Sequence, residues 1–125
     1  MTKRLSILVV DDQPEIRAAL RRCLNAYGNK ILEAGSGEDA LSLVKSESID
    51  AVVTDYDMPG MNGLELLKRL RIMKPAMRRI LLTGRADVRI AARALNEGCV
   101  HRFLLKPWQD YDLEGIVRIT LSTAE

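Results

Sequence analysis

Short, nearly continuous apolar runs alternate along this chain with segments in which apolar residues recur at helical spacing. A continuous apolar run is typical of a strand that is covered on both faces, whereas spacings of three and four residues mark one face of a helix. The pattern predicts strands at residues 5–10, 30–34, 49–54, 79–83 and 100–105. A helical segment follows each of them, so the chain reads as five strand–helix units.

Turn-forming and capping residues mark the ends of the helical segments. Pro14 suits the first turn of a helix, where its missing N–H costs nothing. Gly28 is placed to end the first helix, and Gly98 is placed to end the fourth helix in the left-handed conformation. Ser36 and Asp39 have the spacing of a capping box, which predicts the start of the second helix.

The apolar stripes of the helices predict which residues face the sheet. In the first helix these residues are Ile16, Leu20, Cys23, Leu24 and Tyr27. In the third helix, which Pro75 ends, they are Leu64, Leu67 and Leu70. In the fourth helix they are Val88, Ala91, Ala92 and Leu95.

Alternating strands and helices predict an α/β fold with a parallel sheet, because strand–helix–strand crossovers are right-handed and bring the next strand in parallel. Apolar strands imply helices on both faces of the sheet. We therefore expect a doubly wound three-layer sandwich, since five units are too few for an eight-fold barrel. Residues 1–125 form one domain in this interpretation, with no internal linker or repeat.

Composition excludes several classes of protein. The chain is 47% hydrophobic and 29% charged, as expected for a globular protein, and its net charge of +2 is too small to argue for nucleic-acid or membrane binding. No apolar run is long enough to span a bilayer, and the N-terminus has no signal-peptide pattern. Cys23 and Cys99 have no metal-like spacing, so we expect buried free thiols and a cytoplasmic location.

Polar residues stand at the ends of four of the predicted strands: Asp11, Asp12, Asp55, Thr83 and Lys106. Parallel strands bring their carboxyl ends to one edge, which is also where ligands bind in such sheets. Three neighbouring carboxylates repel one another, and one lysine cannot neutralise them. An all-oxygen ligand set favours a hard cation such as Mg²⁺, with Mn²⁺ as an alternative. Mg²⁺ points to phosphoryl chemistry, with Asp55 as the nucleophile that forms an acyl phosphate.

The sequence resembles the receiver domains of bacterial two-component response regulators over essentially its whole length. The segments that carry the resemblance are Val-Val-Asp-Asp at 9–12, Thr-Asp-Tyr-Asp-Met-Pro-Gly-Met-Asn-Gly at 54–63, Leu-Leu-Thr-Gly at 81–84 and Leu-Lys-Pro at 105–107. The resemblance implies a flavodoxin-like fold with strand order 2-1-3-4-5. It also implies a signalling switch in a phosphorelay, which dephosphorylates itself slowly and is not a turnover enzyme.

Residue roles follow from the resemblance position by position. Asp55 matches the residue that takes a phosphoryl group from a kinase phosphohistidine. Asp12 and Asp55 match the side-chain ligands of Mg²⁺, the backbone carbonyl of Asp57 matches a third ligand, and Asp11 matches an acid that acts through a bound water. The Lys106–Pro107 peptide bond is expected to be cis.

Further positions match the switching machinery of the family. Lys106 matches the lysine that contacts Asp55 and then the phosphoryl group, and Thr83 matches the hydroxyl that moves onto it. Phe103 matches the switch aromatic but lacks the hydroxyl of the tyrosine often found there, so switching rests on packing. The output face would combine the fourth helix, the fifth strand and the fifth helix, and would offer Arg89, Ile90, Arg93, Arg102 and Trp108.

Two charged positions and one histidine need separate interpretations. Asp57 and Arg85 match positions that tune phosphoryl lifetime, and we expect them to pair across the mouth of the site and to hinder the hydrolytic water. His101 is the only histidine and lies at the wrong end of the fifth strand for the site, so we expect a structural role.

Two alternative functions remain open from the sequence. In a phosphatase of the haloacid dehalogenase type, Asp55-Tyr56-Asp57 would supply a nucleophile and a general acid, but Asp11 and Asp12 would be unexplained. A receiver-like interaction module that takes no phosphate is the second alternative. The expected upstream partner is a histidine kinase or phosphotransfer protein. The expected output partner is an effector domain, an output protein, or a second copy of the chain in a phosphorylation-dependent homodimer. We expect no direct contact with nucleic acid or membrane.

Overall fold

The computed structural model describes residues 4–26 and 28–122, so Tyr27, which we expected to face the sheet, lies outside the described residues. The strands are β1 (Ser6–Val10), β2 (Lys30–Ala34), β3 (Ala51–Asp55), β4 (Arg78–Thr83) and β5 (Arg102–Leu105). The helices are α1 (Pro14–Asn25), α2 (Gly37–Ser46), α3 (Gly63–Met73), α4 (Val88–Asn96) and α5 (Asp110–Ser122). A 3₁₀ turn, η1 (Arg85–Asp87), precedes α4 and was not predicted.

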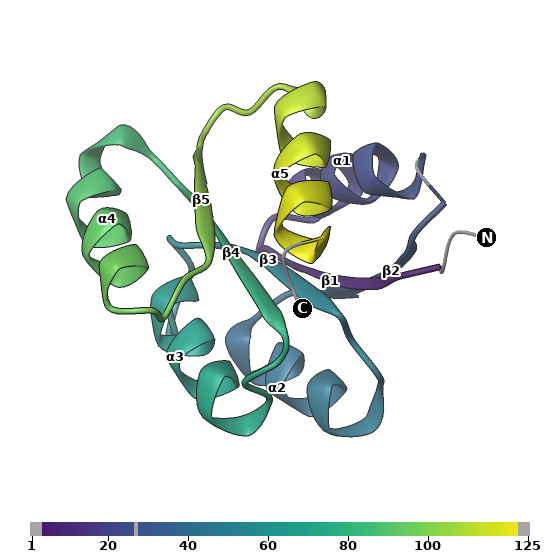
Figure 1. Ribbon diagram of the computed structural model, residues 1–125, viewed down its shortest axis with the longest axis horizontal. Coiled ribbons are helices and arrows are strands. Elements are labelled where there is room, and N and C mark those ends of the chain that lie inside the picture. The colour runs from purple at the N-terminus through teal and green to yellow at the C-terminus, as the bar shows by residue number, and fades with distance from the viewer. Residues whose placement is uncertain (1–3, 27, 123–125) are drawn as a thin grey trace.

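The five strands form one parallel sheet in the order β2-β1-β3-β4-β5, which confirms the predicted fold class and strand order (Figure 1). Val10 pairs with Thr54 across β1 and β3, and Thr83 pairs with Leu105 across β4 and β5. The inner strands therefore end at nearly the same level. Residues that follow these ends share one edge of the sheet.

Helices cover both faces of the sheet. In Figure 1, α1 and α5 lie on one side of it, and α2, α3 and α4 lie on the other. Successive residues of β1 point to opposite faces, as strand geometry requires, so Ile7 and Val9 pack with α1 and α5. Leu8 and Val10 pack in the second core, beneath α2, α3 and α4. This double coverage explains the continuous apolar strands.

The predicted face of α4 is partly wrong. Ala91 is fully buried as expected, but Ala92 is exposed and Leu95 is 38% exposed, whereas Ala94 is 1% exposed and was not predicted to face the core. Alanines occupy three of these positions and carry too little apolar surface to indicate a side of the helix. Only packing against the sheet decides which of them turn inward.

The predicted helix boundaries are largely confirmed. Pro14 opens α1, and the Ser36 hydroxyl accepts a hydrogen bond of 3.1 Å from the N–H of Asp39 at the start of α2. Gly28 and Gly98 both have φ of 82°, the left-handed conformation that favours glycine. Within the described residues, no helix is both long and apolar enough to cross a membrane.

Candidate functional site at the carboxyl edge of the sheet

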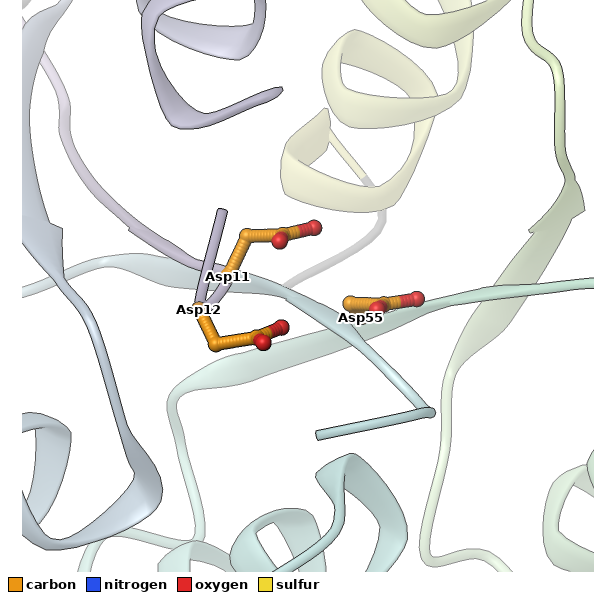
Figure 2. A group of neighbouring side chains, drawn as sticks. All are labelled: Asp11, Asp12 and Asp55. Atoms are coloured by element: carbon orange, nitrogen blue, oxygen red, sulfur yellow. The ribbon is translucent and has the colours of Figure 1, made fainter. Parts of the chain in front are cut away.

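Three carboxylates meet where β1 and β3 end. Asp11 and Asp12 follow β1 directly, and Asp55 is the last residue of β3, its neighbour in the sheet. One carboxylate oxygen from each residue lies within 4.8 Å of the others. Figure 2 shows the side chains of Asp11 and Asp12 extending toward the side on which Asp55 lies. The structure thus brings together the three acids that the sequence predicted.

A lysine from the far edge of the sheet completes the cluster. Lys106 follows β5, and its Nζ lies 2.6 Å from Oδ1 of Asp55. The Asp55 residue is only 3% exposed, whereas the Lys106 side chain is 33% exposed, so this charge-assisted ion pair is partly buried. The backbone N–H of Lys106 donates to the carbonyl of Thr83 at 2.9 Å, and its bond to Pro107 is cis as expected. These contacts confirm that Lys106 reaches Asp55.

Thr83 ends β4, between the strands that carry Asp55 and Lys106. It is 1% exposed, and its hydroxyl donates a hydrogen bond of 3.2 Å to the carbonyl of Gly84. The Thr83 hydroxyl is therefore hydrogen-bonded within the loop that follows β4. A stronger, anionic acceptor in the site would compete with that neutral carbonyl.

Burial and like charges disfavour ionisation of Asp11. Desolvation is the largest effect that raises the pKa of this carboxyl, and the charges of Asp55 and Asp12 raise it further. The backbone N–H of Gln13, which donates to Oδ1 of Asp11 at 2.9 Å, acts in the opposite direction, as does Lys106. The cluster therefore holds more negative charge than its surroundings neutralise.

The donor set fits a hard divalent cation. All three side chains offer carboxylate oxygens, and one ammonium faces three acids. Mg²⁺ is commonly held by one or two carboxylates together with waters and phosphate oxygens. The group of Asp11, Asp12 and Asp55 is therefore suited to hold such a cation, which would offset the negative charge of the three carboxylates.

The loop between β3 and α3 holds Asp55 in place through close packing. Met58 and Met61 are 6% and 8% exposed and anchor the loop in the core. The backbone of Gly63, at the start of α3, approaches that of Asp55 so closely that an added Cβ would overlap with the Asp55 carbonyl. Asn62 and Glu65 form a capping box that fixes the first turn of α3, and their spacing in the sequence is a signal for the start of this helix.

Arg17 belongs to the site, although it was not predicted from the sequence. Its Nη1 donates a hydrogen bond of 2.6 Å to the backbone carbonyl of Asp11. Glu33, near the end of β2, holds the same guanidinium, with Oε1 3.6 Å from Nε. The only signal in the sequence was a polar residue on the inner half of α1, among apolar neighbours. Arg17 thus anchors the loop that carries two of the three acids.

Other expected residues lie around the site without a direct contact to the acids. Asp57 and Arg85 are both exposed, and among the described residues no ion pair joins them. The predicted pairing of Asp57 with Arg85 is therefore not formed in this structure, and their effect on phosphoryl lifetime stays a prediction. Phe103 is partly buried and packs against the core beneath α2, α3 and α4.

His101 lies at the opposite end of β5 and serves a structural role, as expected. Its Nδ1 accepts a hydrogen bond of 2.9 Å from the N–H of Arg79, and its Nε2 lies 3.2 Å from Nη1 of Arg78. Burial and the charges of Arg79, Arg78 and Arg102 lower the pKa of His101 to about 4. The imidazole is therefore neutral at physiological pH.

Comparisons with known proteins agree with this geometry. The family model for the response regulator receiver domain matches residues 7–118. Sporulation initiation phosphotransferase F of Bacillus subtilis is 32% identical over 112 residues, which cover 90% of each protein. The response regulator protein TrrA from Thermotoga maritima, solved in complex with Mg²⁺-BeF, superposes with a TM-score of 0.83 at 33% identity, covering 93% of this chain and 98% of that one.

A third relative is much longer than this chain. The hydrogenase transcriptional regulatory protein HoxA of Cupriavidus necator is 33% identical over 116 residues, which cover 93% of this chain and 24% of that protein. The chain therefore spans about a quarter of this curated relative.

Proposed function

Because the chain belongs to the response regulator receiver domain family, we propose that it is a phosphorylation-activated switch whose phosphoacceptor is Asp55. The observation that carries this proposal is the pair of Asp55 and Lys106, 2.6 Å apart and next to two further acids. A buried nucleophilic carboxylate with a bound ammonium suits the transfer of an anionic group, because charge neutralisation carries most of the catalysis in such transfers.

The proposed donor is the phosphohistidine of a histidine kinase or phosphotransfer protein. An Asp55 oxygen forms a bond to phosphorus while the phosphorus–nitrogen bond breaks, and the imidazole nitrogen leaves with the electron pair. Lys106 holds the carboxylate before transfer and then donates to a phosphoryl oxygen. Asp12 and Asp55 would bind Mg²⁺, with the backbone carbonyl of Asp57 as a third ligand and Asp11 acting through a water.

Phosphorylation would then change the β4–α4 connection. A phosphoryl group adds up to two negative charges and strong acceptor oxygens beside Thr83. We expect the Thr83 hydroxyl to exchange its 3.2 Å bond to the Gly84 carbonyl for a charge-assisted bond to phosphate. That movement makes room for Phe103 to turn inward, which reshapes the face formed by α4, β5 and α5 for an effector domain, an output protein or a second copy of the chain.

The proposed setting is cytoplasmic signalling rather than catalytic turnover. Cys23 and Cys99 are free and buried, which fits a reducing compartment. The family assignment favours a phosphoacceptor over the phosphatase alternative. Slow self-catalysed dephosphorylation would return the switch to its resting state, with Asp57 and Arg85 setting its rate.

Mass spectrometry of the intact protein with acetyl phosphate and Mg²⁺ tests the proposal. We expect one added phosphoryl group in the wild type and none in Asp55→Asn. The matched control is Asp57→Asn, two residues away, which should still be phosphorylated. A chain that never takes up phosphoryl would support the phosphate-independent module instead. Repeated turnover of an aryl phosphate, lost in Asp57→Asn, would support the phosphatase.

A further inference from the structure

A shallow groove of about 260 Å³ lies between α3 and α4, on the outer surface of the helical layer that Figure 1 shows on one side of the sheet. Its lining combines apolar and cationic side chains with a single carboxylate. The lining residues are Leu64, Lys68, Arg89, Ile90, Arg93, Ala94 and Glu97. None of them belongs to the acidic site at the carboxyl edge of the sheet.

The cations of this groove lack partners. Lys68, Arg89 and Arg93 are exposed, and none of them takes part in an ion pair within residues 4–26 and 28–122. Arg89 and Arg93 are four residues apart on α4, so their like charges face the same side and destabilise the helix slightly. No acidic residue within α4 relieves this repulsion, and Glu97, which follows the helix and lines the groove, forms no ion pair with Arg93 in the described part of the chain. An anionic partner would relieve the repulsion.

The floor of the groove is apolar. Ile90 is 40% exposed, and Leu64 is partly buried beside it on α3. Ala94 is 1% exposed, and its small side chain leaves the floor hollow between the larger neighbours. An apolar stripe between cationic walls matches a helix with leucine-like residues on one face and acids on its flanks. A nucleic-acid backbone would match the charges but not the floor.

We propose that the groove between α3 and α4 docks an acidic amphipathic helix of a partner protein. The apolar face of that helix packs on Ile90 and Leu64, and its acidic flanks pair with Lys68 on one wall and Arg93 on the other. This surface shares Arg89, Ile90 and Arg93 of α4 with the predicted output face. It differs from that face because Leu64 and Lys68 of α3 form its other wall and it contains no residue of β5 or α5.

The two helices that line the groove, α3 and α4, are connected to the acidic site in different ways. Helix α3 begins at Gly63, whose backbone is packed against that of Asp55. Helix α4 follows the loop that Thr83 begins, and η1 separates the two. Movement of Thr83 would therefore shift α4 relative to α3 and change the affinity for the helix. This coupling rests on the proposed function, whereas docking to the unphosphorylated protein does not.

The test is an NMR titration of the intact, unphosphorylated protein with a synthetic helical peptide of about 18 residues, with leucines on one face and glutamates flanking them. We expect amide shifts to concentrate at Leu64, Lys68, Ile90 and Arg93. Lys68→Glu and Arg93→Glu should each weaken binding by about tenfold at low salt, since each reverses a charge at the interface. Lys45→Glu, an exposed lysine on α2 outside the groove, should change the affinity by less than about twofold.

Several outcomes would overturn the proposal. These are no binding of the glutamate peptide at millimolar concentration, equal binding of a lysine-for-glutamate peptide, and stronger binding of a short DNA duplex than of the peptide. Shifts centred on β5 and α5, with binding lost in Arg102→Glu but not in Lys68→Glu, would assign the helix to the output face instead. Because the protein is unphosphorylated throughout, failure of phosphorylation at Asp55 leaves this test intact.

Discussion

Arg17 donates a hydrogen bond of 2.6 Å to the carbonyl of Asp11, and through it α1 holds the loop that carries Asp11 and Asp12. Glu33 keeps the guanidinium in place from β2. Gly35 leaves room for it, since a Cβ there would lie 3.2 Å from Nη1 of Arg17. The acidic cluster is therefore positioned by a residue that contributes no ligand atom to it.

Removal of this anchor should weaken metal binding. Arg17→Ala frees the Asp11 carbonyl and the loop around it, so we expect Mg²⁺ affinity to fall by about tenfold. Calorimetric titration with Mg²⁺ measures the change. The control is Arg21→Ala, which removes only an exposed ion pair with Glu33 at 3.1 Å and should leave the affinity unchanged. Equal affinities in Arg17→Ala and the wild type would show that the loop holds its shape without the anchor.

The acidic cluster should cost stability when no cation is bound. Asp11 is 1% exposed beside two other carboxylates, so its charge is both desolvated and repelled. Asp11→Asn keeps the oxygen that accepts from Gln13 but removes the charge. We expect the free energy of unfolding of the metal-free protein at pH 7 to rise by about 1 kcal/mol. Urea denaturation measures it.

Urea denaturation in the presence of Mg²⁺ is a second test of the repulsion among the three carboxylates. Mg²⁺ should stabilise the wild type against urea in proportion to its occupancy, because it binds only the folded chain. It should stabilise Asp11→Asn less, since one negative charge is gone. A variant that is less stable than the wild type without metal would contradict the repulsion argument.

Gly63 should not tolerate any side chain. A Cβ there would overlap with the backbone of Asp55, which cannot move without displacing the phosphoacceptor. We expect Gly63→Ala to lower the free energy of unfolding by about 2–3 kcal/mol and to slow phosphorylation. The control is Gly115→Ala within α5, where a Cβ meets nothing within 4 Å. That change should raise stability by about 0.5–1 kcal/mol. Thermal unfolding of both variants measures the contrast.

His101 should make stability depend on pH. Its folded pKa is about 4, below the 6.5 of an unperturbed histidine, so the unfolded chain binds a proton in that interval and the folded chain does not. The contribution is complete above pH 6.5 and is lost as the pH falls toward 4. We expect a loss of about 1–2 kcal/mol, reduced from the full value by the partial exposure of the ring.

Urea denaturation between pH 7 and pH 4 tests this prediction in the wild type and in His101→Gln. Glutamine can still accept from the N–H of Arg79 but does not titrate in this range. The slope should therefore be shallower in the variant. The same slope in both proteins would assign the acid sensitivity to the carboxylates instead.

The sequence by itself determined the fold and the acidic cluster. Continuous apolar runs separated by helical stripes specify a parallel sheet that is covered on both faces, and parallel strands must end at a common edge. Asp11 and Asp12 follow β1, and Asp55 ends β3. Both are inner strands, so the proximity of the three acids required no knowledge of side-chain packing. Lys106 follows the edge strand β5, and its long side chain reaches Asp55 from there.

Only the tertiary structure determined the contacts that depend on how helices and loops pack against that sheet. Arg79 is 3% exposed and binds backbone carbonyls of two loops, including those of Cys99 at 2.9 Å and Met77 at 3.1 Å. Nothing in its apolar strand marked it as buried. The sequence pattern also did not predict the inward face of α4, the hydrogen bond from Arg17 to Asp11 or the groove between α3 and α4. These features depend on side chains from segments far apart in sequence, which meet only after the helices have packed.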